Sequence, residues 1–140
     1  MKKAAQMLER FTYTYDKATQ LFDAMRSPAT CYADYVNGQL LDDCDGFHAA
    51  LYHIADHNNL DCYLLTYMTE DVTKSHTILA IKYATNNWVA FDYDRALVSS
   101  TGPARLAEFA AHNHKTEVIK YNLVKYDYYK GYYYIVKDVE

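Results

Sequence analysis

Backbone-breaking residues are scarce in this chain of 140 residues, which contains only 4 glycines and 2 prolines. Average usage would give about 10 glycines and about 7 prolines at this length. The 3 cysteines are an odd number and too few for the disulfide framework of a small secreted protein. A hydrophobic content of 51% excludes a disordered chain. We therefore expect long regular elements in a single domain, residues 1–140, with one core.

The chain also lacks a basic excess and a long apolar segment. Its 18 acidic and 14 basic residues give a net charge of −4, which argues against a nucleic-acid partner. No run approaches 18 consecutive apolar residues, so no membrane-spanning helix is expected. The first ten residues lack the apolar core of a secretory signal. These absences predict a cytoplasmic protein whose cysteines are reduced thiols.

The spacing of apolar residues predicts helices first and strands afterwards. A repeating 4,3 spacing between residues 4 and 25 predicts a long amphipathic helix that ends at Ser27-Pro28. Residues 29–42, which include the turn signal Asn37-Gly38, are expected to be loop that can contain a short helical piece. Further helices are predicted from Asp43-Cys44 to 57–59 and over 104–111. Runs rich in β-branched and aromatic residues predict strands at 62–69, 76–83, 88–93, 117–126 and 132–139. This order predicts an α+β fold with helices packed on one antiparallel sheet.

Cys44 is the first candidate for a chemical role. It lies in the segment Asp42-Asp43-Cys44-Asp45-Gly46-Phe47, in the first turn of the second predicted helix. Unpaired backbone N–H groups and the helix dipole favour the thiolate there, and they can stabilise an oxyanion. The flanking aspartates favour the neutral thiol, so a histidine partner is needed. Cys31 and Cys62 are interpreted as structural thiols, since free cysteine is often buried.

A histidine and a carboxylate are available on two neighbouring strands. His76 begins one predicted strand, and Asp92 lies near the end of the next. A three- or five-residue hairpin loop puts Asp92 or Asp94 on the same face as His76. A two- or four-residue loop puts them on opposite faces unless a β-bulge intervenes. In the matching arrangement the carboxylate orients the imidazole, and the imidazole serves the thiol.

These positions resemble the transglutaminase-like core of the papain-like superfamily, in particular the bacterial transglutaminase-like cysteine proteinases. The matching motifs are Asp43-Cys44-Asp45-Gly46-Phe47-His48-Ala49, Ser75-His76-Thr77 and Trp88-Val89-Ala90-Phe91-Asp92. His76 follows Cys44 by 32 residues and precedes Asp92 by 16, as is typical of the family. The resemblance covers residues 28–95. Residues 96–140 form a helix and hairpin extension, in which 7 of the 16 tyrosines lie between Tyr121 and Tyr134.

The resemblance implies a papain-like fold and a hydrolase of the cysteine protease type. Cys44 would be the nucleophile, His76 the general base and acid, and Asp92 the carboxylate that orients the imidazole. The implied reaction is hydrolysis or acyl transfer at an amide or other acyl bond of a protein or peptide, through a thioester. It requires no metal or organic cofactor. The family's oxyanion glutamine is absent from its usual position, and Gln39, five residues before the cysteine, is the candidate substitute.

Other histidines leave alternatives open. His48 lies one turn after Cys44 and is a second candidate base, although the family geometry, in which the base comes from the sheet, favours His76. His53 and His57 stand four apart on the same predicted helix and could share a metal ion. No third ligand is evident in the sequence, since the remaining histidines, at 112 and 114, fall in a predicted loop far along the chain.

The tyrosine-rich segment also allows more than one interpretation. Lysines lie between its tyrosines, a pattern that can stack single-stranded nucleic acid. Tyrosine also covers a half-buried sheet well, with its ring packed and its hydroxyl in water. The acidic net charge favours this structural role. A further hypothesis is a catalytically silent transglutaminase-like domain that binds a protein partner through this segment.

Overall fold

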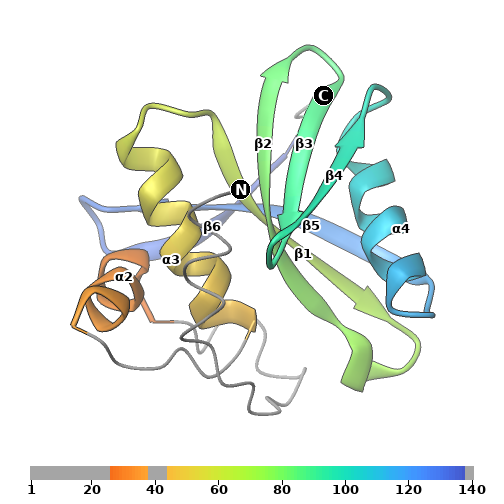
Figure 1. The fold of residues 1–140 in the computed structure, drawn as a ribbon, viewed down its shortest axis with the longest axis horizontal. Coiled ribbons are helices and arrows are strands. Elements are labelled where there is room, and N and C mark those ends of the chain that lie inside the picture. The colour runs from red at the N-terminus through yellow and green to blue at the C-terminus, as the bar shows by residue number, and fades with distance from the viewer. Residues whose placement is uncertain (1–25, 38–43, 138–140) are drawn as a thin grey trace.

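The computed structural model describes residues 26–37 and 44–137, and every structural statement below concerns this part of the chain. The described residues form three α-helices and one six-stranded antiparallel sheet (Figure 1). The predicted α+β class is therefore confirmed. The predicted first helix, between residues 4 and 25, lies outside the described residues, as does Gln39.

Most predicted elements are present, with bounds that differ by a few residues. The helices are α2 (Pro28–Val36), α3 (Cys44–His57) and α4 (Ala104–Asn113). The strands are β1 (Cys62–Thr69), β2 (His76–Ala84), β3 (Asn87–Asp92), β4 (Arg95–Ser99), β5 (Val118–Asp127) and β6 (Tyr132–Val136), with the short 3₁₀ helix η2 (Val72–Lys74) before β2. The predicted C-terminal hairpin is confirmed, since β5 pairs with β6.

The segment after Ser27-Pro28 is helical over more of its length than predicted, because this dipeptide starts α2. The hydroxyl of Ser27 accepts a hydrogen bond from the backbone N–H of Thr30 at 3.2 Å, which caps the helix. Pro28 takes the first helical position, where its missing N–H costs nothing. The sequence analysis used the same two residues only as the end of the preceding helix.

Strand β4 was not predicted, and the strand before it begins and ends one residue earlier than expected. β3 ends at Asp92, and the chain turns at Tyr93 and Asp94 before Arg95 pairs back with Asp92. Tyr93 has a φ of 58°, a conformation uncommon for a residue with a bulky side chain. A strand of five residues after so tight a turn leaves little periodicity to detect.

The sheet joins the two halves of the chain. Its strand order is β4-β3-β2-β1-β5-β6, so β5 from the tyrosine-rich half lies beside β1 from the half that carries the motifs. Helices α2 and α3 cover one face of the sheet and α4 covers the other (Figure 1). Fully buried side chains on the two faces include Phe47, Tyr52 and Leu64 with α3, and Trp88, Leu65 and Leu106 with α4.

A β-bulge sets the alignment of the β2–β3 hairpin. Only two residues, 85 and 86, connect the strands, and the register shifts between Lys82 and Ala84. Without this shift, Asp92 would lie on the opposite face from His76. The bulge is favoured because it keeps Trp88 and Ala90 buried on the α4 side, whereas a slip of one residue would turn them to the other face, where Val89 and Phe91 are only partly buried. The hairpin therefore has a two-residue loop, for which the sequence required a β-bulge if His76 and Asp92 were to share a face, and the structure contains that bulge.

The remaining composition-based expectations concern cysteines and membranes. Cys31 and Cys62 are free and buried, as expected of structural thiols. Among the described helices, none combines the length and the apolar character needed to cross a membrane.

Candidate functional site

A buried carboxylate connects three elements that are far apart in the sequence. Asp92 ends β3 and its side chain is only 3% exposed. One of its oxygens, Oδ1, accepts a hydrogen bond from Nε2 of His76 at 2.7 Å. The other, Oδ2, accepts one from Nε2 of His114 at 2.7 Å. The structure therefore brings the predicted pair His76 and Asp92 together and adds a second histidine.

Hydrogen bonding and burial shift the pKa values of this cluster in opposite directions. Burial alone raises the pKa of Asp92, but the hydrogen bonds from His114 and His76 outweigh it and hold that pKa well below its usual range. The hydrogen bond to Asp92 raises the pKa of His114 above its usual value, although partial burial opposes the change. Asp92 is therefore an anion at neutral pH, and we assign the Nε2 proton to both imidazoles from the hydrogen-bond network.

Aromatic rings hold the imidazole of His76 on several sides. Its ring centroid lies 5.9 Å from that of Tyr67, which is its partner across β1 and β2. The rings of Tyr93 and His48 each lie 5.7 Å away, and that of His114 lies 5.1 Å away. The side chain of His76 is 10% exposed. These contacts fix the orientation of the ring before any substrate binds.

His48 has a structural contact that the sequence did not reveal. It was expected to point off the side of its helix, but its side chain is fully buried between α3 and the sheet. Its Nε2 accepts a hydrogen bond from the backbone N–H of Tyr93 at 2.9 Å. Since this lone pair is already used, His48 is a poor candidate base through Nε2. It instead connects α3 to the turn that follows Asp92.

Cys44 is the first residue of α3, as predicted, and lies one helical turn before His48. Because the ring of His48 lies 5.7 Å from that of His76, the first turn of α3 is close to His76. The structure describes the backbone of Cys44, whereas its side chain lies outside the described part.

Neither family models, nor curated proteins, nor solved structures match this chain. The geometry of the site is therefore the basis for any statement about its role.

His114 is the site residue that the sequence analysis missed. It was expected in a distant loop, but it caps the C-terminus of α4, where its backbone N–H bonds to the carbonyls of Ala110 and Ala111. The available signal was a histidine just past a helix that ends beside the sheet. Local pattern could not show that α4 covers the face on which Asp92 lies.

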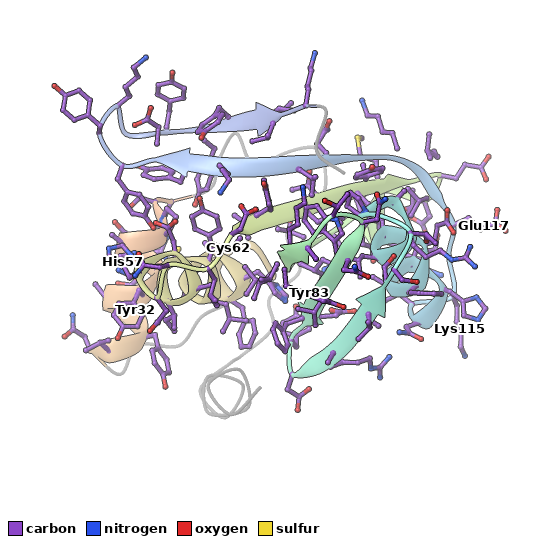
Figure 2. All side chains as sticks on the ribbon, turned by 90° about the horizontal axis from the view of Figure 1, so that it is seen from above. Tyr32, His57, Cys62, Tyr83, Lys115 and Glu117 are labelled. Carbon is purple, nitrogen blue, oxygen red and sulfur yellow. The ribbon has the colours of Figure 1, made fainter. Side chains whose placement is uncertain are left out.

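The other histidine pair is engaged elsewhere. Nδ1 of His53 makes a 3.1 Å hydrogen bond with the hydroxyl of Tyr128, and Nδ1 of His57 bonds to the carbonyl of His53 at 3.0 Å. Figure 2 places His57 at the opposite end of the molecule from Lys115, the neighbour of His114. Within the described residues, the one cluster of three residues with metal-binding atoms is His76, Asp92 and His114.

The elevated pKa of His114 predicts a pH-dependent contribution to stability. A group with a raised folded-state pKa stabilises the protein fully below its unfolded pKa, 6.5 for this residue, and loses that effect as pH rises through the folded value. We expect His114→Ala to lower the free energy of unfolding by about 1 kcal/mol near pH 5.5, a value reduced for partial exposure, and by less near pH 9.

Urea unfolding at both pH values measures this effect. His112→Ala is the matched control, since His112 is exposed on the same helix and makes no hydrogen bond with Asp92. A loss that grows with pH would contradict the assignment of charge to this pair.

Proposed function

We propose that this protein is a thiol-dependent acyl-bond hydrolase or acyl transferase with a transglutaminase-like, papain-like core. In this proposal Cys44 is the nucleophile, His76 is the general base and acid, and Asp92 orients the imidazole. The observation that carries the proposal is the 2.7 Å hydrogen bond from Nε2 of His76 to the buried carboxylate of Asp92. A buried charge of this kind is costly and is typical of a site that fixes an imidazole.

The choice of nitrogen supports a role for His76 toward a thiol. Because Nε2 is bonded to Asp92, Nδ1 is the nitrogen that can exchange a proton with a nucleophile. The first turn of α3, where Cys44 lies, is close to the same ring. The helix dipole of α3 favours a thiolate at that position. In this proposal α3 supplies the nucleophile, β2 the base and β3 the carboxylate that orients the base, which are the three roles that nucleophilic catalysis needs.

The proposed reaction has two balanced steps. The thiol of Cys44 gives its proton to Nδ1 of His76, and its sulfur bonds to the substrate carbonyl carbon. The imidazolium then protonates the leaving amine or alcohol, and a thioester remains. In the second step His76 removes a proton from water or an amine, the new nucleophile displaces sulfur, and the thiol is restored.

The oxyanion formed in each step needs hydrogen-bond donors. The backbone N–H of Cys44, at the start of α3, is the proposed main-chain donor, since an N–H group at this end of a helix points toward an incoming anion. Gln39 remains the candidate side-chain donor. The proposed substrates are proteins or peptides, and the chemistry needs no cofactor.

A second candidate is a protein-binding module, and the exposure of aromatic side chains favours it. Tyr129 in the β5–β6 turn is 97% exposed, and Tyr132, the first residue of β6, is 50% exposed. Tyr134 and Ile135 on β6 are 40% and 41% exposed. Tyrosine is enriched at protein interfaces. On this second proposal the domain is catalytically silent and the cluster around Asp92 is structural.

Alkylation of the reduced protein by iodoacetamide separates the two proposals. We expect Cys44 to react at about pH 6.5 at least about tenfold faster than Cys31 and Cys62, because the thiolate is the reactive form. Burial shields these two controls and raises the pKa of Cys62 to about 12. The sites and rates are read by peptide mass spectrometry across pH.

Two variants make the test specific. His76→Ala should remove the fast reaction below the reference thiol pKa of about 8.5, whereas His57→Ala should not, because His57 lies far from the cluster. Equal, slow labelling of all three cysteines would contradict the enzyme proposal and favour the binding module.

A further inference from the structure

The cluster around Asp92 has a feature that a simple triad does not require. Asp92 bonds to two histidines rather than one, and each contact measures 2.7 Å. The three side chains offer two imidazole nitrogens and one carboxylate oxygen, all within 4.8 Å of one another. They come from β2, β3 and the end of α4, so the fold itself, not sequence proximity, brings them together.

We propose that His76, Asp92 and His114 form a binding site for a divalent transition-metal ion of the zinc class. Two neutral imidazoles and a carboxylate are a ligand set that zinc accepts, with a fourth position left for water or another donor. For the ion to bind, each ring must carry its proton on Nδ1 in place of Nε2, and a ring that is protonated on both nitrogens releases its Nε2 proton to solvent, so that both histidines bind as neutral imidazoles. Its binding does not depend on the proposed thiol chemistry.

The geometry is close to what such an ion needs. Zinc binds nitrogen and oxygen ligands at about 2.0–2.2 Å, which places neighbouring ligand atoms of a tetrahedral site about 3.3 Å apart. The two 2.7 Å contacts are made to different oxygens of Asp92, so only the contact to the oxygen that binds the ion would open by about 0.6 Å. The other Nε2 lies within 4.8 Å of the remaining ligand atoms and would move in to about the same separation. His114 follows the last residue of α4 and its side chain is 42% exposed, which allows this adjustment and gives the ion a route from solvent.

Burial and charge within the cluster also favour a cation. The carboxylate of Asp92 is 3% exposed, and an anion so deeply buried is stabilised by positive charge. His76 is held by surrounding rings and is 10% exposed, so it would be a preorganised ligand.

Metal binding would also regulate the proposed enzyme. The ion would occupy Nε2 of His76 and leave the ring proton on Nδ1, which is the nitrogen that must be free to accept the thiol proton in the proposed reaction. We therefore expect zinc to suppress the fast alkylation of Cys44. This consequence rests on the proposed function, whereas binding alone does not.

Isothermal titration of the reduced full chain with zinc chloride tests the site. We expect one ion per chain, and we expect His114→Gln to raise Kd by at least about tenfold, since losing even a supporting partner of a metal site costs 10- to 100-fold. Glutamine keeps an N–H donor for Asp92, so this variant should stay folded. His112→Ala and His57→Ala are the controls and should leave Kd unchanged.

Two further measurements decide between metal ligands. Cys44→Ser should retain zinc, and the cobalt-loaded protein should show no thiolate charge-transfer absorption. Equal Kd values for the parent and His114→Gln, or loss of zinc in Cys44→Ser or His57→Ala, would overturn the site. If the protein binds zinc but its zinc-free form shows no fast labelling of Cys44, only the proposed enzyme is contradicted. If the zinc-free form shows fast labelling but the protein does not bind zinc, only the metal site is contradicted.

Discussion

Replacement of Asp92 by alanine is expected to lower the free energy of unfolding by about 3 kcal/mol and to remove the fast alkylation of Cys44. The carboxylate is the shared acceptor for two Nε2–H groups, and it is almost fully buried. Without it, the His76 donor, 10% exposed, loses its partner, and the imidazole loses the bond that fixes its orientation. Urea unfolding and the pH profile of labelling measure the two effects separately.

The matched control for this change is Asp94→Ala. Asp94 is an exposed aspartate two residues further along the chain, and its loss should cost less than about 0.5 kcal/mol. Asp92→Asn keeps the volume but presents an amide N–H to one of the two histidines, so it should recover part of the stability and little of the reactivity. Full stability and full reactivity in Asp92→Ala would show that the cluster has no role in either.

Replacement of His48 by phenylalanine is expected to lower the free energy of unfolding by about 2 kcal/mol. The ring volume is kept, but the backbone N–H of Tyr93 loses the Nε2 acceptor at 2.9 Å in a buried place. Because this bond connects α3 to the turn after Asp92, the first turn of α3 should also shift relative to His76. We therefore expect slower labelling of Cys44 with its pH profile unchanged, since the base itself remains.

The two histidines can be told apart by the shape of that profile. His76→Ala should shift the onset of labelling toward the reference thiol pKa of about 8.5, whereas His48→Phe should lower the rate at all pH values alike. His48→Gln offers a new acceptor for Tyr93 and should restore part of the stability. A shifted onset in His48→Phe together with an unchanged onset in His76→Ala would identify His48 as the base.

The local sequence pattern was sufficient to predict those elements whose own residues show a clear hydrophobic period or a strong strand preference. The start of α3 at Cys44 follows from an apolar face that begins at Phe47, and both bounds of β1 follow from its β-branched and aromatic residues. The extent of α2 was underestimated because Ser27-Pro28 can end one helix and start another. β4 was missed because five residues after a turn at Tyr93 carry almost no period.

The site required information that only packing provides. The sequence did not show whether His76 and Asp92 lie on the same face of the sheet, because that depends on a single extra residue in the hairpin. The burial of Trp88 and Ala90 decides this point, and burial is a property of the whole sheet. His114 joins the site only because α4 lies over that same face. The hydrogen bond of His48 likewise depends on the turn at Tyr93, 45 residues later.

The bulge in the β2–β3 hairpin has a practical consequence for protein engineering. The connection at residues 85 and 86 lies at the far end of both strands from His76 and Asp92. Tyr83 is the additional residue of the bulge, and its deletion would leave Lys82 opposite Trp88. Residues inserted at the tip would only lengthen the loop. A reporter peptide or fluorophore can therefore be placed at this tip, whereas a one-residue insertion between Trp88 and Asp92 would turn the carboxylate to the opposite face of the sheet.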